Sequence, residues 1–296
     1  MSDPGSGALN RFIDLHAHTN ESDGSLTPEE LVHLAKRNAL DALAITDHDT
    51  FSGYEKAVPF AHDAGLELVR GIELNAKLNG AASQRSLHLL AYFPSSAPSQ
   101  EFVAFLDAQR RERRNRNLRL ADALCRQGVR VSVDEVESRG RSLAGRVHFA
   151  RLLVEKGYAA SSSDAFRRYL GEDAPTYTPR ESYTVEQAID IVRRGGGVPV
   201  IAHPVRLGLS REAERQLFTH LKAVGLLGIE IYHSEHAPTL QAHYRQLAEE
   251  LELLPTGGSD FHGAPKPDID LGTGLKGNVR VPREFLDRMR AWAPHA

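Results

Sequence analysis

The sequence lacks three features that would each place it in a familiar class of protein. It has a single cysteine, Cys125, so no disulfide can form within the chain and a disulfide-stapled secreted scaffold is excluded. It has no apolar run near the ~20 residues that a membrane-spanning helix needs. Its formal net charge of −3 is too small for a protein whose whole surface binds polyanions. We therefore expect a protein of a reducing compartment, the cytoplasm.

Residues 1–10 are small and polar. They do not show the basic start and apolar core of a secretory signal, and we expect them to form a disordered tail. The remaining length, with a hydrophobic content of 41%, suits one large domain that carries an insertion.

Short apolar runs predict seven strands, most of them followed by a helical pattern. The clearest helix spans 28–40, with Thr27 as its N-cap and Pro28 at its first position. Apolar strands that alternate with helices indicate a parallel sheet or barrel. The predicted strands are 11–17, 41–49, 66–74, 86–93, 197–204, 225–233 and 253–262.

The interval from about 95 to 185 breaks this rhythm and has only helical patterns. We predict that 96–184 is an inserted helical lid, and that 11–95 and 185–296 form the barrel. Residues 101–183 hold 16 arginine and lysine residues against 12 aspartate and glutamate residues. The insertion is therefore basic and the remainder acidic.

Histidine, aspartate and glutamate recur at the predicted strand ends. In parallel β/α folds the carboxyl ends of the strands share one rim, where active sites lie. Alternate residues of a strand face the same side, so His-x-His and Asp-x-His pairs can hold one ion or two adjacent ions. The residues concerned are His16, His18, Asp47, His48, Asp49, Glu73, His88, His203, Glu230, His233, Asp260 and His262.

Taken singly, each of these residues has a plainer interpretation, as a hydrogen-bonded core residue or a turn cap. Taken together they favour a metal site, because burying so many ionisable groups without a metal is costly. Imidazole and carboxylate ligands suit Zn²⁺, Mn²⁺ or Fe²⁺.

The motifs DLHAHTNESDG, ITDHDT, GIEL, LHLLAYF, VIAHP and GGSDFHG, in that order, resemble the polymerase and histidinol phosphatase (PHP) family. The resemblance covers nearly the whole chain. It implies a distorted seven-stranded (β/α)7 barrel with an inserted helical lid, three divalent metal ions, and hydrolysis of phosphate esters.

The resemblance also implies a ligand set. His16, His18, Glu73 and Asp260 would hold the first metal, and Glu73 would bridge to the second, with His88 and His203. The third metal would bind Asp23, His48 and His262. We favour Mn²⁺ from the resemblance. A metal-bridging hydroxide would then attack phosphorus, since metals lower the pKa of bound water.

The insertion motifs GRVHFARLLVEKGY, AFRRYLG and PTYTPR resemble those of stand-alone PHP enzymes that act on nucleotides. We predict that Arg146, His148 and Arg180 bind substrate phosphate, with His148 also a candidate general acid. Arg146 could instead pair within the lid. The run RRERRNRN at 110–117 is interpreted as a solvated helix face rather than a nucleic-acid site. Tyr158, Tyr169, Tyr177 and Tyr183 are interpreted mostly as packing residues, and His233 as orienting a ligand.

The leading hypothesis is a phosphatase that removes the 3′-phosphate of 3′,5′-nucleoside bisphosphates. The close alternative is a 5′-3′ exoribonuclease acting on short RNA at the same site. A histidinol-phosphate phosphatase is less consistent with the basic insertion, and a non-catalytic metal-binding module predicts a broken ligand position that we do not find. No membrane or obligate protein partner is expected.

Overall fold

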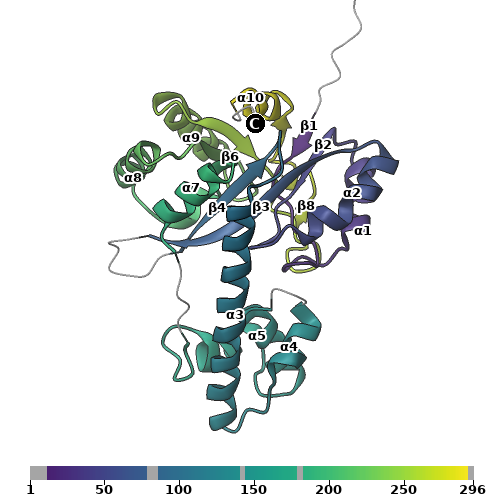
Figure 1. Ribbon diagram of the computed structural model, residues 1–296, viewed down its shortest axis with the longest axis vertical. Helices are drawn as coiled ribbons and strands as arrows, with labels where there is room; N and C mark the ends of the chain where they lie inside the picture. The colour runs from purple at the N-terminus through teal and green to yellow at the C-terminus, as the bar shows by residue number, and fades with distance from the viewer. Residues whose placement is uncertain (1–11, 79–85, 141–143, 179–182, 293–296) are drawn as a thin grey trace, which may run out of the picture.

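The computed structural model describes residues 12–78, 86–140, 144–178 and 183–292. Its upper part in Figure 1 is an α/β unit in which helices surround a curved sheet. From the sheet, α3 (Gln100–Arg126) runs down toward α4 (Val133–Gly140) and α5 (Arg146–Glu155). In the described ranges, every helix is too short or too polar to cross a membrane.

Eight strands form the main sheet, in the order β10-β1-β2-β3-β4-β5-β6-β7. The segments that follow β1 and β7 are hydrogen-bonded to each other, with Leu15 N 3.1 Å from Gly257 O and His18 N 2.9 Å from Phe261 O. The sheet is therefore nearly closed into a barrel. The strands are β1 (Phe12–Asp14), β2 (Ala42–Ile45), β3 (Glu67–Lys77), β4 (Ser86–Phe93), β5 (Val198–Ile201), β6 (Gly228–Tyr232), β7 (Leu254–Gly257) and β10 (Val281–Pro282), with β8 (Ile269–Asp270) and β9 (Gly274–Leu275) as a separate pair.

The barrel differs from the predicted parallel one in two respects. β4 is antiparallel to both β3 and β5, and β10 adds an eighth strand antiparallel to β1. Only eight residues separate β3 from β4, and a parallel crossover needs a dozen or more. The reversal places His88, near the start of β4, at the same rim as the ends of the parallel strands.

The helix α1 (Pro28–Arg37) begins where the predicted N-cap, Thr27, places its start. Thr27 and Glu30 form a capping box at the start of α1, and Pro28 occupies its first turn, as expected. Asn38 ends this helix at Arg37, three residues before the predicted end. The helices around the sheet are α1 (Pro28–Arg37), α2 (Ser52–Ala64), α7 (Val185–Arg194), η3 (Pro204–Leu207), α8 (Arg211–Ala223), α9 (Pro238–Glu250) and α10 (Glu284–Trp292).

Most of the described residues between 100 and 170, within the predicted insertion, are helical. Leu120, Leu124, Phe149 and Leu153 belong to an apolar cluster of its own, separate from the clusters of the barrel. We call residues 100–170 the helical segment. It comprises α3 (Gln100–Arg126), α4 (Val133–Gly140), α5 (Arg146–Glu155), α6 (Ser162–Ala165) and the π-helical turn η2 (Phe166–Leu170).

Candidate metal centre

Nine side chains from separate segments of the chain converge at one rim of the barrel. Three of them follow β1, one follows β2, one lies in β3, one in β4, one follows β5 and two follow β7. All are buried except Asp23, His48 and His88, which are partly buried. We call them the rim cluster: His16, His18, Asp23, His48, Glu73, His88, His203, Asp260 and His262.

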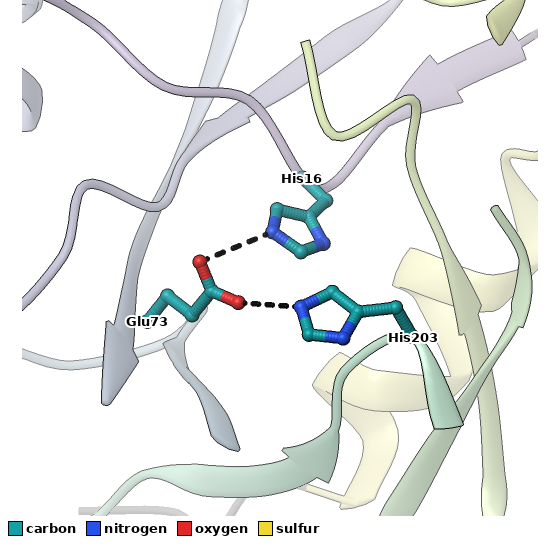
Figure 2. A group of neighbouring side chains, drawn as sticks. All are labelled: His16, Glu73 and His203. Atoms are coloured by element: carbon teal, nitrogen blue, oxygen red, sulfur yellow. Dashed lines mark hydrogen bonds and ion pairs between the residues drawn. The ribbon is translucent and has the colours of Figure 1, made fainter. Parts of the chain in front are cut away.

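Glu73 lies at the centre of the rim cluster. Its Oε1 is 2.8 Å from His88 Nδ1 and 2.9 Å from His203 Nε2, and Figure 2 shows its two oxygens facing His16 and His203. Its Oε2 is 3.2 Å from His18 Nε2. Burial raises the pKa of this carboxyl, but the surrounding histidines outweigh burial and hold the pKa well below its ordinary value. Glu73 is therefore ionised at neutral pH.

Asp23 and Asp260 complete the cluster on either side of His18 and His262. The nearer oxygen of Asp260 is 3.5 Å from His18 Nε2 and 3.5 Å from His262 Nδ1. Asp23 lies 3.4 Å from His262 Nε2 and 3.7 Å from His48 Nε2. Ligand atoms in four sets of three lie within 4.8 Å of one another: His16, Glu73 and His203; His16, His18 and Asp260; His18, Asp23 and His48; His48, Glu73 and His88.

The buried carboxylate of Glu230, on β6, orients two members of the cluster. One oxygen is 2.9 Å from His16 Nδ1 and the other accepts from the backbone N–H of His203 at 2.6 Å. Burial opposes ionisation, but His16 and His233 lower the pKa of Glu230 to about 2. Because an ionised carboxylate only accepts, His16 Nδ1 carries a proton, and Nε2 is the nitrogen that would bind a metal ion.

The donors fit divalent metal ions. Among the residues that the structure describes, the buried Nε2 atoms of His16 and His18 have no hydrogen-bond partner, although both point at carboxylates. Burial lowers the pKa of each ring, yet the nearby carboxylates outweigh it and raise the pKa of His18 to about 9. Buried carboxylates need positive charge beside them, and divalent cations on imidazole and carboxylate ligands would supply it.

Asp260 turns Oδ1, its inner oxygen, toward the histidines of the cluster, and three donors hold Oδ2, its outer oxygen, on the other side. Arg206 lies 2.8 Å from it, Lys266 2.7 Å and His233 Nε2 3.3 Å. His233 Nδ1 accepts from the backbone N–H of Glu235, so Nε2 carries the proton that faces Asp260. This arrangement leaves the inner oxygen of Asp260 for the histidines, and it gives His233 the orienting position that the sequence predicts.

Two further buried carboxylates hold the loops that carry the cluster. Asp14 accepts from the backbone N–H groups of His16 and Ser259, at 3.1 and 3.0 Å. Asp47 accepts from Thr19 N at 2.8 Å and Ser22 Oγ at 2.5 Å. At the neighbouring glycine, a Cβ on Gly258 would collide with the backbone nitrogen of His16, so this position requires glycine.

The backbone is strained at three of the strand ends. Asp49, His203 and Asp260 have φ of 52°, 27° and 56°, in the left-handed region that non-glycine residues rarely adopt. Such strain gathers at functional sites because surrounding contacts enforce it. At His203 these contacts include the bond to Glu230, and at Asp260 they include those to Arg206, Lys266 and His233.

We expect the buried His236, whose ring centre is 5.2 Å from that of His233, to make the stability of the protein depend on pH. Its Nδ1 lies 2.8 Å from Ile231 O, and burial, then His233, lowers its pKa to about 4. Between pH 6.5 and 4 the unfolded chain therefore binds a proton that the folded chain does not, so stability falls as the pH falls. From pH 7 to 5 we expect this residue to cost about 2 kcal/mol of unfolding free energy.

Urea unfolding of the metal-free chain at both pH values measures this effect. The His236→Phe variant should lose that share of the pH dependence, whereas His62→Phe, at an exposed histidine, should keep it. Equal pH slopes for wild type and His236→Phe would disprove the assignment.

A cavity of about 330 Å³ borders the rim cluster at Asp23 and His48 and extends toward the helical segment. We call it the rim cavity. Arg146 and His148 line it, as do Phe166 and Tyr177, whereas Arg180 lies outside the described residues. The guanidinium of Arg146 is 6.0 and 5.9 Å from the ring centres of Phe166 and Tyr177, and it donates to Leu170 O at 3.3 Å.

The arginine-rich run of α3 is not simply a solvated face. Arg116 and Asn117 are buried, Arg113 pairs with the buried Asp49, and both arginines line the rim cavity. The sequence interpretation was wrong for these three residues. Arg113 and Asn117 bond to residues from distant parts of the chain, Asp49 and Ala144. For the tyrosines, Tyr158 and Tyr169 pack on the helical segment and Tyr183 in the barrel, whereas Tyr177 lines the rim cavity.

Known proteins are similar to this chain in sequence and in fold. The PHP domain profile matches residues 14–159. The chain is 32% identical to a 5′-3′ exoribonuclease of Haemophilus influenzae, across 90% of this chain and 95% of that protein. It is 29% identical to a 3′,5′-nucleoside bisphosphate phosphatase of Chromobacterium violaceum, across 88% and 90%. A solved protein of Bifidobacterium adolescentis, described as a candidate metal-dependent phosphoesterase, has a TM-score of 0.78 and 31% identity, covering 98% of this chain and 97% of that one.

A histidine–carboxylate cluster at a barrel rim, with these similarities, defines a metal-dependent phosphoesterase, a hydrolase that acts on phosphate ester bonds. The chain belongs to the PHP domain family.

Proposed function

We propose that the chain removes the 3′-phosphate of 3′,5′-nucleoside bisphosphates, with three divalent metal ions, Mn²⁺ favoured, held by the rim cluster. The observation that carries this proposal is the rim cavity, which joins the cluster to a set of cations. Lys77, Arg113, Arg116 and Arg146 line it, and Asp23 and Glu172 are the acidic residues among its described lining. Its volume is at the lower end of the range for small-molecule sites.

Each part of the chain has a role in this proposal. Metal ions bound to the cluster would activate water and neutralise phosphate oxygens. Glu230 orients His16 and His203, and the donors on Asp260 keep its inner oxygen turned to the cluster. Arg146 and His148 would hold the second phosphate, and Phe166 or Tyr177 would pack against the base.

His148 suits hydrogen bonding better than proton transfer. Its Nδ1 accepts from the backbone N–H of Gly145 at 3.2 Å, so its proton lies on Nε2. Burial first, then Arg151, lowers its pKa, and the ring is neutral at pH 7. A neutral imidazole is a poor general acid, and we assign His148 as a donor to substrate phosphate.

Arg146 provides the test. For the Arg146→Met variant, kcat/KM in Mn²⁺ should fall about 10-fold or more on adenosine 3′,5′-bisphosphate, the loss of one charge-assisted contact worth ~1.5–3 kcal/mol. On adenosine 3′-monophosphate, which lacks the second phosphate, it should change little. Arg167→Met, at an exposed pair with Asp164, is the matched control. Equal losses on both substrates would contradict the role of Arg146, and no hydrolysis of either by wild type would overturn the substrate.

A 5′-3′ exoribonuclease is the second candidate, because the same cavity would hold the first nucleotide of an RNA. A 5′-phosphorylated RNA in the same assay decides between them, since efficient shortening would make the bisphosphate activity secondary. Histidinol phosphate is the third substrate to assay. Its amine calls for acidic residues, and cations outnumber them in the rim cavity.

A further inference from the structure

A second hollow lies beside the rim cavity on α3. Its volume is about 440 Å³, and Arg110, Arg111, Arg113 and Arg114 line it together with Glu137. We call it the arginine groove. The buried Asp49 already pairs with Arg113, so the positive charge that the groove offers comes from Arg110, Arg111 and Arg114. The groove therefore suits an anionic ligand.

The arginine groove and the rim cavity adjoin each other. Arg113 forms part of the wall of both. Ala144 lines the groove and the next residue, Gly145, lines the cavity. Asn117 donates to Ala144 O at 2.7 Å and so ties α3 to this boundary. A chain leaving the cavity past Arg113 would enter the groove.

Apart from the buried pair of Arg113 and Asp49, the ion pairs already present in the groove are exchangeable. Arg114 is half exposed and lies 3.0 Å from Glu137 and 3.6 Å from the exposed Asp134. Exposed pairs of this kind contribute at most about 1 kcal/mol, whereas guanidinium groups bind phosphate through two parallel hydrogen bonds. Phosphates can therefore replace these carboxylates at little cost.

The spacing of the arginines suits a polymer. Arg110 and Arg114, which both line the groove, are about 6 Å apart along the axis of α3 at 1.5 Å per residue. Proteins that bind single strands use such positively charged grooves to follow successive phosphates. The rim cavity has room for one nucleotide, so any further nucleotides lie outside it, beside α3.

We propose that the arginine groove binds the phosphate backbone of a single-stranded polynucleotide, RNA or DNA, whose 5′-terminal nucleotide occupies the rim cavity. This inference rests on the proposed function for the placement of the 5′ end. It extends the substrate from a single nucleotide to a strand, and it gives the exposed arginines of the run at 110–117 a role.

Charge reversal in the groove tests the proposal. In the Mn²⁺-loaded full chain, Arg111→Glu combined with Arg114→Glu should lower kcat/KM for a 5′-phosphorylated decamer at least 10-fold more than for adenosine 3′,5′-bisphosphate. The slope of the logarithm of the decamer binding constant against the logarithm of the salt concentration should become less steep by about 0.7 per lost phosphate contact. RNA and DNA decamers of one sequence show which strand is preferred.

Arg126→Glu is the matched control, because Arg126 lies on the same helix outside the groove and pairs with Asp122. It should affect neither substrate. If charge reversal unfolds the chain, Arg111→Gln with Arg114→Gln makes the same test with a smaller expected change. The proposal would be overturned if the groove variant lost kcat/KM equally on the decamer and the bisphosphate, or if Arg126→Glu lost as much on the decamer as the groove variant does. It would also be overturned if a ten-residue glutamate peptide competed for the groove as well as an unlabelled decamer.

Binding of a labelled decamer in chelator separates this inference from the proposed function. Tight binding with a steep salt dependence that the groove variants flatten would support the groove even if no substrate were hydrolysed. Salt-independent binding would overturn the groove while leaving bisphosphate hydrolysis intact.

Discussion

Replacing Glu73 with glutamine should strip metal from the rim and lower phosphoester hydrolysis by more than about 100-fold. Removing an outer partner of a metal ligand costs about 10–100-fold, and we propose that Glu73 is itself a ligand. Its two oxygens face His88 and His203 on one side and His18 on the other. The amide keeps the shape of the side chain but loses the charge that would join two metals.

Metal content per chain and kcat/KM, measured on the same preparation, test this prediction. Glu67→Gln is the control, because Glu67 lies on the same strand and pairs with Arg283 and Arg290 away from the rim. It should retain both metal and activity. A Glu73→Gln enzyme with full metal content and near-normal kcat/KM would show that Glu73 is not a ligand.

The Glu230→Gln variant should lose 10–100-fold in metal affinity and about 1–3 kcal/mol of stability. Both oxygens of Glu230 accept, one from the His16 ring and one from the backbone N–H of His203. Glutamine offers one acceptor and one donor. Either the His203 N–H loses its acceptor, or His16 must carry its proton on Nε2, the nitrogen that would bind the metal. The loss of charge also makes the His16 ring a poorer ligand.

Calorimetric Mn²⁺ titration and urea unfolding of the metal-free chain separate the two effects. Glu249→Gln, at an exposed residue of α9, is the control and should change neither. A variant that unfolds more easily but binds Mn²⁺ as wild type does would reduce Glu230 to a structural residue.

The strand-end pattern predicts that most of the rim cluster converges, because the carboxyl ends of parallel strands share one rim. Asp23 comes only from the resemblance to the PHP family. His16 and His18 are one residue apart, and both reach Glu73 and Asp260. The role of Glu230 was not predictable, since nothing local distinguishes a glutamate that accepts two hydrogen bonds from one that caps a turn. Its partners lie 214 and 27 residues away along the chain.

Two other differences between the sequence prediction and the structure also arise from contacts that are distant along the chain or from the lengths of connections. The antiparallel direction of β4 follows from the short connection before it, because eight residues are too few for a parallel crossover. The burial of Arg116 and the pairing of Arg113 with Asp49 depend on where α3 crosses the barrel rim. An arginine run does not reveal which of its members meet a buried aspartate and which meet solvent.

Anomalous scattering from crystals of the full chain grown with Mn²⁺, collected at the manganese absorption edge, would locate the metal ions. Three peaks are expected within the rim cluster, one beside His16 and His18, one beside His88 and His203, and one beside Asp23 and His48. Peaks at other places, or no peak among these residues, would contradict the proposal that the rim cluster holds three metal ions.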